Sequence, residues 1–347
     1  MPLILALGCS FVITFILVPP LMKKMKEGRM VGRDINKFNR PEVPELGGIA
    51  AVFGFAVGLS IVVGEEKLRG FAYETPLLAS VGVFFIAGMI GLIDDISNLS
   101  QKIKSVVVAF AALPLIIWHG FGPEEEGIIH NINFPFGKSV SFLPVGSTQY
   151  YLFWFIAVPA AITIVANLVN MSAGYNGLES GEIMVISSVL FTVMLAKDPK
   201  AFFDRRYPTA ALLFLAVIGC SAALYVFNRY PSKIFIGNIG TMGLGAVIGA
   251  GVIMSGLAFY CAVAMLPAFY EAGATIYYRM KSVDRRPACH NPIIREDGRL
   301  EPPKEARYYT LAFFILSKRP MNEKNLVRVM LLIYGLFGLI ALVLAII

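Results

Sequence analysis

Long apolar runs alternate with short polar connections along the whole chain. The run at 75–93, for example, contains no charged residue and ends immediately before Asp94 and Asp95. An uncharged stretch of about 17–25 residues is long enough to cross the hydrocarbon core of a bilayer as an α-helix. The pattern therefore predicts an all-α polytopic membrane protein. We expect about ten transmembrane helices, at 3–22, 46–64, 76–94, 104–118, 150–166, 182–196, 209–227, 240–253, 255–270 and 327–347.

The apolar stretch at 240–270 allows two interpretations. It is long enough for a single tilted helix, but the segment GAGVIMSG at 249–256 favours a glycine-rich turn between two short helices. The charge pattern supports the turn, because ten spans place the most basic connections on one side. These connections are 23–45, 95–103, 167–181, 228–239 and 271–326. The positive-inside rule then makes that side cytoplasmic and leaves both termini external.

Two features outside the spans add detail. In the external connection at 119–149, the segment IIHNINFPFGKSVSFLP alternates apolar and polar residues around a Gly-Lys turn, which predicts a small external β-hairpin. The net charge of the chain is +7. Basic cytoplasmic loops beside anionic membrane lipids account for this charge, so it indicates no nucleic-acid partner.

Composition also places the chain among membrane proteins. It is 57% hydrophobic and 15% charged, whereas a soluble domain carries about 25% charged residues. We therefore expect one membrane-embedded domain over 1–347 and no separate soluble domain. Residues 3–22 are long enough to span and precede KKMK, which predicts a first helix rather than a cleaved signal peptide. The four cysteines form no C-x-x-C pair and indicate neither a zinc site nor a disulfide framework.

The polar motifs gather in the five connections predicted to be cytoplasmic. They are GRDINKFNRPEVPELGG (32–48), DDISNLSQKIK (94–104), NLVNMSAGYNGLESGE (167–182), FNRYPSKIFIGNIGTMG (227–243) and RRPACHNPIIREDGRLEPP (285–303). Mg²⁺ is bound through a few protein oxygens plus substrate phosphates, Lys and Arg contact phosphate oxygens, and glycine turns let the backbone approach a nucleotide. The combination predicts phosphoryl transfer, which needs positioning and charge neutralisation more than a protein nucleophile.

Each motif also has a structural interpretation. Asp94 and Asp95 could be a polar pair at a helix end. Consecutive helical residues point about 100° apart, so we expect both to serve one site only if the helix frays there. Lys104 begins the next apolar run and could be an interfacial anchor. Asn167 and Asn170 share a helical face, and such an amide face can also join two helices.

As a set, the motifs resemble those of the polyprenyl-phosphate N-acetylhexosamine-1-phosphate transferases. GLIDDISNLSQKIK, NLVNMSAGYNGLESGE and YPSKIFIGNIG look like the signature blocks of that family. In the first connection, G-x-D-x-N-K and P-E-x-x-G are similar to the motifs of the branch that uses UDP-N-acetylglucosamine and dolichyl phosphate. The same holds for His-x-Pro followed by Gly-Arg-Leu-Glu at 290–301. The blocks are spread over nearly the whole chain.

The resemblance implies a ten-helix fold with a cytoplasmic active site and Mg²⁺, or alternatively Mn²⁺, as cofactor. It implies transfer of N-acetylglucosamine-1-phosphate from UDP-N-acetylglucosamine to a dolichyl or polyprenyl phosphate. UMP would be released, in the first step of lipid-linked oligosaccharide synthesis for N-glycosylation. By motif position, the catalytic candidates are Asp94, Asp95 and Lys104, and the metal candidates are Asn170 and Asn238. The substrate-binding candidates are Arg33, Asp34, Ile35, Glu45, Asn167, Asn176, Gly177, Cys289 and His290.

Two positions depart from the family pattern. The block before the eighth helix usually ends in a metal-binding Asp, and here that position is Asn238, so the site lacks one negative charge. In the fifth connection, Ala288 and His290 stand where the eukaryotic pattern has arginines. An amide oxygen can still coordinate a metal, so the first departure predicts weaker Mg²⁺ binding. It also raises the alternative of a catalytically inactive membrane relative.

Other functions remain as alternatives. The three histidines are far apart, unlike those of the bacterial cell-wall relative that transfers phospho-muramoyl-pentapeptide, but a bacterial-type transfer to undecaprenyl phosphate stays open. A secondary transporter would place ionisable groups near the bilayer midplane and show inverted repeats, and the sequence has neither feature. The short chain and basic connections favour an archaeal-type cell membrane, with the endoplasmic reticulum membrane as the alternative. A homodimer is an open alternative to a monomer.

Overall fold

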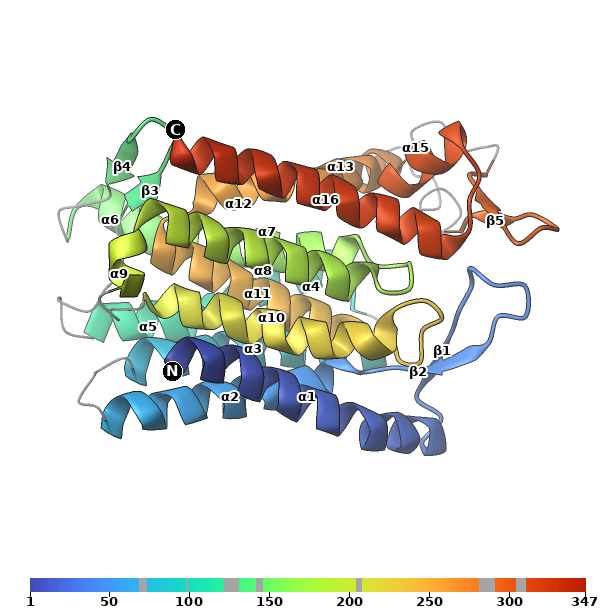
Figure 1. Ribbon diagram of the computed structural model, residues 1–347, viewed down its shortest axis with the longest axis horizontal. Helices are drawn as coiled ribbons and strands as arrows, with labels where there is room; N and C mark the ends of the chain where they lie inside the picture. The colour runs from blue at the N-terminus through green and yellow to red at the C-terminus, as the bar shows by residue number, and fades with distance from the viewer. Residues whose placement is uncertain are drawn as a thin grey trace.

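Helices form most of the chain in the computed structural model (Figure 1), which describes residues 1–68, 74–97, 99–121, 131–141, 146–203, 208–280, 291–303 and 310–347. The longer helices are α1 (Pro2–Glu27), α2 (Gly48–Leu68), α3 (Glu74–Ser97), α7 (Val158–Met171), α8 (Leu178–Lys197), α10 (Thr209–Asn228), α11 (Gly237–Ser255), α13 (Leu266–Met280) and α16 (Glu323–Ile346). The shorter segments are α4 (Gln101–Val107), η1 (Val108–Ala112), α5 (Leu113–Phe121), α6 (Thr148–Leu152), η2 (Phe153–Ala157), α9 (Pro199–Phe203), α12 (Ala258–Ala264) and α15 (Leu311–Lys318).

Eight helices in the described part of the chain are long and apolar enough to cross a membrane. A ninth candidate is the pair Ala258–Ala264 and Leu266–Tyr278, which is bent by 69°. The predicted span at 104–118 contains a shorter apolar helix, Val108–Trp118. The chain is therefore a helical integral membrane protein. The number of ten spans and the external placement of the termini stay predictions.

The turn predicted within 240–270 is present. Helix α11 ends at Ser255, and Gly256 follows it with a φ of +65°. Glycine adopts this left-handed conformation without steric cost, which is why it commonly ends helices. Helix α12 begins at Ala258, so the apolar stretch forms separate helices rather than one.

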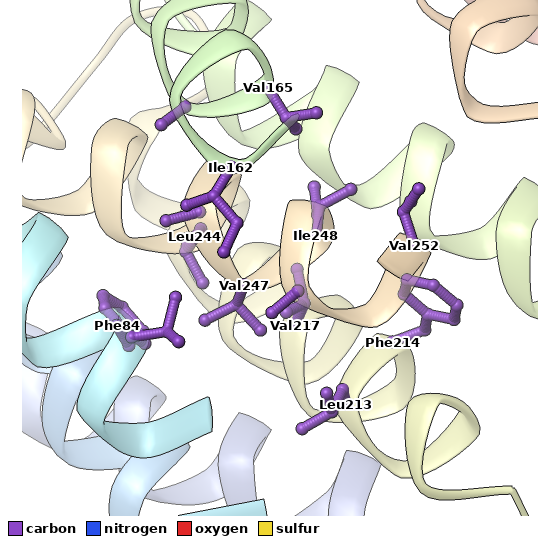
Figure 2. Close-up of a cluster of buried hydrophobic side chains, with 14 of the residues drawn as sticks. Phe84, Ile162, Val165, Leu213, Phe214, Val217, Leu244, Val247, Ile248 and Val252 are labelled. Carbon is purple, nitrogen blue, oxygen red and sulfur yellow. The ribbon is translucent and has the colours of Figure 1, made fainter. Parts of the chain in front are cut away.

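Helix α11 lies at the centre of the bundle. In its 18-residue apolar segment, 89% of the residues are buried, the highest share among the candidate spans of the described residues. Figure 2 shows side chains from α3, α7, α10 and α11 meeting around it, among them Phe84, Ile162, Val165, Leu213, Phe214, Val217, Leu244, Val247, Ile248 and Val252. Lipid tails are as apolar as these side chains, so close van der Waals packing holds the helices together.

Glycines let two neighbouring helices approach α11 closely. A Cβ at Gly91 of α3 would lie 2.3 Å from the backbone oxygen of Asn238. A Cβ at Gly48 of α2 would lie 2.3 Å from the Cα of Gly240. A side chain at either position would push the helices apart. The contact at Gly91 holds the end of α3, which carries the two aspartates, against the beginning of α11.

The connections separate to the two ends of the bundle (Figure 1). Strands β1, β2 and β5 lie at one end, which we call the site end, while β3, β4 and both termini lie at the other. Asn131–Asn133 (β3) pairs antiparallel with Ser139–Ser141 (β4), which confirms the predicted β-hairpin. Two further pairs were not predicted: β1 (Val31–Arg33) with β2 (Glu42–Pro44), and β5 (Ile293–Ile294) with β6 (Leu300–Glu301).

Candidate active site

A polar cleft of about 450 Å³ opens at the site end of the bundle. Its lining residues are Arg33, Asp34, Ile35, Asn36, Glu45, Asp95, Ala173, Gly174, Tyr175, Asn176, Glu179, Asn228, Phe235, Gly237, Asn238 and Thr241. The sequence had already singled out these lining residues as candidates: Arg33, Asp34, Ile35, Glu45, Asp95, Asn176 and Asn238. Four connections that are far apart in the sequence therefore meet in one concave surface.

Four of the candidate side chains form a closed hydrogen-bonded network behind this cleft. The Nζ of Lys104 donates to Asp94 Oδ2 at 2.7 Å and to Asn170 Oδ1 at 2.8 Å. Asn170 Nδ2 donates to Asn238 Oδ1, and Asn238 Nδ2 donates to Asp94 Oδ2 at 2.8 Å. Lys104 is 2% exposed and Asp94 7%. Removing one partner of such a buried ion pair leaves the other charge unpaired, which costs about 3–5 kcal/mol.

Asp95 is held by the first backbone amides of α11. Its Oδ1 accepts from the N–H of Asn238 at 3.0 Å, and its Oδ2 accepts from the N–H of Ile239 at 3.3 Å. The first N–H groups of a helix have no partner within the helix and favour a negative charge. A Cβ at Gly237, whose φ is +73°, would lie 2.9 Å from Asp95 Oδ2. Glycine thus leaves room for a carboxylate that is anchored and still faces the cleft.

The two aspartates contact the same residue of α11 without any fraying of their helix. Helix α3 continues to Ser97, so Asp94 and Asp95 point about 100° apart as consecutive helical residues do. Asn238 contacts both, because its side chain donates to Asp94 and its backbone N–H donates to Asp95. The helix therefore need not fray for both carboxylates to reach the same partner, contrary to the expectation from the sequence. The beginning of α11 reaches both carboxylates at once.

Glu323, which the sequence did not single out, joins three connections. It is 3% exposed. Its Oε1 accepts from the N–H of Asn176 at 2.9 Å and from Asn36 Nδ2 at 3.1 Å, and its Oε2 accepts from Asn176 Nδ2 at 3.1 Å. Asn176 Nδ2 also donates to Asp34 Oδ2 at 2.9 Å, and Lys37 pairs with Asp34 and Glu323. An acid in the first turn of a helix suits the helix dipole, so its sequence position gave no sign of this role.

Glu45 lies against the β1–β2 hairpin at the edge of the cleft. A Cβ at Gly32 would lie 2.1 Å from its Oε1, so glycine at that position makes room for the carboxyl group. Burial raises the pKa of Glu45 above its ordinary value. Asp95 and Glu179 are further acidic residues of the same cleft. Their common location makes the cleft suited to a cation.

Among the described residues, the candidates Asn167 and Gly177 are not part of the cleft lining. Asn167 lies on α7, where its Nδ2 donates to the backbone oxygen of Thr163 at 2.8 Å. Gly177 precedes α8 with a φ of +87°, and a Cβ there would lie 2.9 Å from the Cα of Arg229, so glycine is needed for the backbone. Cys289 and His290 lie outside the residues that the structure describes.

Comparison with known proteins identifies the family. Residues 77–256 match the model of glycosyl transferase family 4. The chain belongs to this family. The matched segment contains the whole network of Asp94, Lys104, Asn170 and Asn238, together with Asp95.

Relatives of this glycosyl transferase family 4 member come from archaea and bacteria. A Saccharolobus solfataricus protein, provisionally named UDP-N-acetylglucosamine–dolichyl-phosphate N-acetylglucosaminephosphotransferase, is 33% identical over 249 residues, 72% of this chain and 70% of the relative. A provisionally named glycosyltransferase of Methanocaldococcus jannaschii is 28% identical over 338 residues, 97% and 95% of the two chains. A phospho-N-acetylmuramoyl-pentapeptide-transferase of Desulforamulus reducens is 27% identical over 266 residues, 72% and 73%. The chain is thus a phosphosugar transferase by class.

The donor set of the family member's cleft fits a magnesium ion that is shared with a substrate. Glu45, Asp95, Glu179 and Asn238 offer oxygen atoms. Within the described part of the chain, no three His, Cys, Asp or Glu side chains are grouped so that they could hold a metal ion. The Oδ1 of Asn238 already accepts from Asn170 but retains a second lone pair. Mg²⁺ typically takes one or two carboxylates plus substrate phosphates, which is what this set can supply.

Proposed function

We propose that this protein transfers N-acetylglucosamine-1-phosphate from UDP-N-acetylglucosamine to a dolichyl-type polyprenyl phosphate and releases UMP. The product would be the first lipid-linked intermediate of N-glycan assembly. The names of the archaeal relatives support this choice of donor and acceptor. The bacterial relatives act on a different phosphosugar by name, so donor and acceptor both need a direct test.

The observation that carries the proposal is the position of Asp95. Its carboxylate is fixed by two backbone amides, faces the polar cleft, and adjoins the buried network of Lys104. Helix α3, which ends just beyond it, is a candidate membrane span. A lipid phosphate at the membrane surface and a soluble nucleotide sugar could both reach such a carboxylate.

Asp95 would accept the proton of the lipid phosphate. The freed phosphate oxygen then attacks the β-phosphorus of the UDP-sugar and forms the new P–O bond. The bond between the β-phosphorus and the bridging oxygen breaks, and its electron pair leaves with UMP. Phosphoryl transfer of this kind depends on alignment and charge neutralisation. A carboxylate held in one place by α11 supplies the alignment for the proton transfer.

Lys104 and Asp94 would provide charges at fixed positions behind the reacting phosphates. Lys104 holds Asp94 and Asn170, and both of these hold the side chain of Asn238. Because every member of the network has a partner, the side chains are fixed before substrate binds. A preorganised polar site need not reorganise during the reaction.

We propose Mg²⁺ as the cofactor, held by Glu179 and Asn238, with Asp95 in the same cleft left to accept the proton. When bound, the ion would neutralise negative charge on the pyrophosphate of the donor. Asn176, Asn36 and Glu323 would hold the connections that receive the nucleotide. We also propose that the site end faces the cytoplasm, where UDP-sugars are made available.

The direct test is transfer from labelled UDP-N-acetylglucosamine to dolichyl phosphate by the purified full chain, with Mg²⁺ and with EDTA. We expect a lipid-linked product and UMP with Mg²⁺, and neither with EDTA. Parallel reactions with undecaprenyl phosphate and with UDP-N-acetylmuramoyl-pentapeptide separate the archaeal from the bacterial type of reaction.

Three results would overturn the proposal. Release of UDP would mean that the sugar moves without its phosphate. Transfer of phospho-muramoyl-pentapeptide in preference to phospho-N-acetylglucosamine would assign the bacterial reaction. Absence of any product from a folded protein with each donor would identify an inactive relative.

A further inference from the structure

A second cleft at the site end is basic rather than acidic. It measures about 410 Å³ and lies between the end of α10 and the beginning of α16. Its lining residues are Asn176, Tyr225, Val226, Arg229, Tyr230, Pro231, Lys233, Lys324, Val327 and Arg328. Four of these carry a positive charge, and none of these lining residues carries a negative charge.

The four cations of this cleft have no acidic partner within the described part of the chain. Arg229, Lys233, Lys324 and Arg328 are exposed, and the ion pairs found there involve other lysines and arginines. The nearby carboxylate of Glu323 already accepts hydrogen bonds from Asn36 and Asn176 and pairs with Lys37. The cleft therefore has an uncompensated positive charge.

An apolar stripe continues from the basic cleft along α16. Lys324 and Arg328 are four residues apart, and Leu332 and Leu336 follow at the same spacing, so each side chain lies about one turn further along the helix and about 40° round from the one before it. Leu332 is 73% exposed and Leu336 is 55% exposed. Only 22% of the residues in the 18-residue apolar segment of α16 are buried. The stripe thus faces outward along a candidate membrane span.

We propose that the basic cleft binds the phosphate of an anionic phospholipid whose acyl chain lies along the stripe of α16. Basic pockets between membrane helices are suited to anionic lipid headgroups. Arg supplies planar hydrogen-bond donors to phosphate oxygens, and Lys supplies a compact charge. The apolar stripe in line with Lys324 and Arg328 favours a lipid over free inorganic phosphate, because only a lipid uses both parts. This site is separate from the network of Asp94 and Lys104.

The bound lipid would adjoin the proposed nucleotide site. Asn176 lines both clefts. Lys37 lies over the ring of Tyr230, with its Nζ 4.8 Å from the ring centroid, and also pairs with Glu323. Lys37 also pairs with Asp34 of the polar cleft, so this lysine contacts a residue of each cleft.

The test compares lipid retention by variants of the full-length protein. The double variant Lys324→Gln, Arg328→Gln removes two cations of the cleft. Lys23→Gln, Lys26→Gln is the matched control, since it removes two exposed cations near the end of α1 that do not line the cleft. Binding of phosphatidylglycerol and phosphatidylcholine is measured by native mass spectrometry, and circular dichroism checks that each variant is folded.

We expect the parent to retain phosphatidylglycerol in preference to phosphatidylcholine. The cleft variant should bind phosphatidylglycerol about thirtyfold more weakly, since each cation near an anionic lipid contributes about a factor of five. The control variant should bind like the parent. Leu332→Asn, which interrupts the stripe, should weaken phosphatidylglycerol binding. The affinity of the basic cleft for inorganic phosphate, measured by competition, should stay the same.

Several outcomes would overturn the proposal. Equal weakening in the cleft variant and the control would mean that the positive charge acts diffusely. Full displacement of the lipid by millimolar inorganic phosphate would assign the cleft to a soluble anion. A second copy of the chain covering α16, detected as a dimer that excludes lipid and is lost in Leu332→Asn, would assign the stripe to self-association.

Discussion

Asp95 combines a fixed position with an open face. Its two oxygens accept from consecutive N–H groups at the beginning of α11, while the side chain lines the polar cleft. Asp94, one residue earlier, is occupied by Lys104 and Asn238. The two carboxylates therefore differ in their surroundings, and Asp95 is the one that faces the cleft, where the proposed reaction would need a proton acceptor.

Asp95→Asn tests this assignment, because it removes the negative charge and keeps the size of the side chain. The amide oxygen can still accept from the N–H of Asn238, so we expect the variant to fold. Turnover should fall by about 10²- to 10⁴-fold, the range for a positioned general base. UMP release measures turnover, and thermal unfolding in detergent checks the fold. The exposed Asp297 pairs with Arg299 and belongs neither to this network nor to the lining of the polar cleft, so Asp297→Asn provides the control. Undiminished turnover in Asp95→Asn would exclude the role.

Glu323 accepts hydrogen bonds from the backbone and side chain of Asn176 and from the side chain of Asn36. Glu323→Gln replaces one acceptor oxygen by an NH₂ group, which then faces other donors such as Asn36 or Asn176. A buried donor without an acceptor costs about 1–3 kcal/mol, so we expect a lower unfolding temperature. We also expect a higher KM for the UDP-sugar, with kcat changed less. Glu301→Gln is the control, because Glu301 forms a more exposed pair with Arg295. A KM equal to that of the parent would contradict the role in holding the nucleotide site.

Glu45 gives a pH dependence of stability. Burial raises its pKa above the ordinary value of 4.5, so the folded state keeps the proton of Glu45 to a higher pH than the unfolded state does. The contribution of Glu45 to the free energy of unfolding is then lost as the pH rises from 4.5 through the raised pKa. Glu45→Gln has no proton to lose. We expect it to unfold at a higher temperature than the parent at pH 8 and at a similar temperature at pH 4. Glu42→Gln, at an exposed position of β2, should leave the unfolding temperature unchanged at both pH values. An unfolding temperature of Glu45→Gln equal to that of the parent at pH 8 would contradict the prediction.

At the scale of elements, the spacing of α3 and α11 decides whether the site forms. The close contact of Gly91 with the backbone of Asn238 brings both aspartates within reach of α11. This contact involves backbone atoms, which cannot rotate away as a side chain would. A larger residue at Gly91 must therefore move a helix.

Gly91→Ala should consequently destabilise the protein by about 1–3 kcal/mol, as overpacking typically does. It should also reduce turnover, because Asp95 moves away from the amides that hold it. Gly335→Ala is the matched control: a Cβ at Gly335 of α16 meets no atom within 4 Å. That variant should be as stable as the parent or slightly more stable, since Ala favours helix over Gly. Normal stability of Gly91→Ala would mean that the two helices are not held at this distance.

The helices were predictable because their signal is local. Each predicted span overlaps a helical segment of the structure, and Gly256 ends α11 within the segment that suggested a turn. The contact between Asp94 and Asn238 joins positions 144 residues apart, and no periodicity encodes it. The motif resemblance placed those two residues near each other. It gave no role to Glu323, whose contacts with Asn176 span 147 residues.

At the scale of the whole molecule, the two ends of the bundle differ in chemistry. The site end holds an acidic cleft suited to a cation and a basic cleft suited to an anion, and the clefts share Asn176. The opposite end holds the β3–β4 hairpin and both termini (Figure 1). This separation was expected from the distribution of polar motifs. The basic cleft was not, because Arg229 and Lys324 belong to segments that are far apart in the sequence.

The length of α11 fixes the depth at which the proposed reaction would occur. Its 19 residues span about 28 Å at 1.5 Å per residue, close to the roughly 30 Å of hydrocarbon in a bilayer. Its first residues, which hold Asp95, are then level with the headgroups of one leaflet. The acceptor would therefore search for the enzyme by lateral diffusion in two dimensions, while the nucleotide sugar arrives from three-dimensional solution. For such an enzyme, the surface density of acceptor lipid, rather than its bulk concentration, would determine how often the two substrates meet.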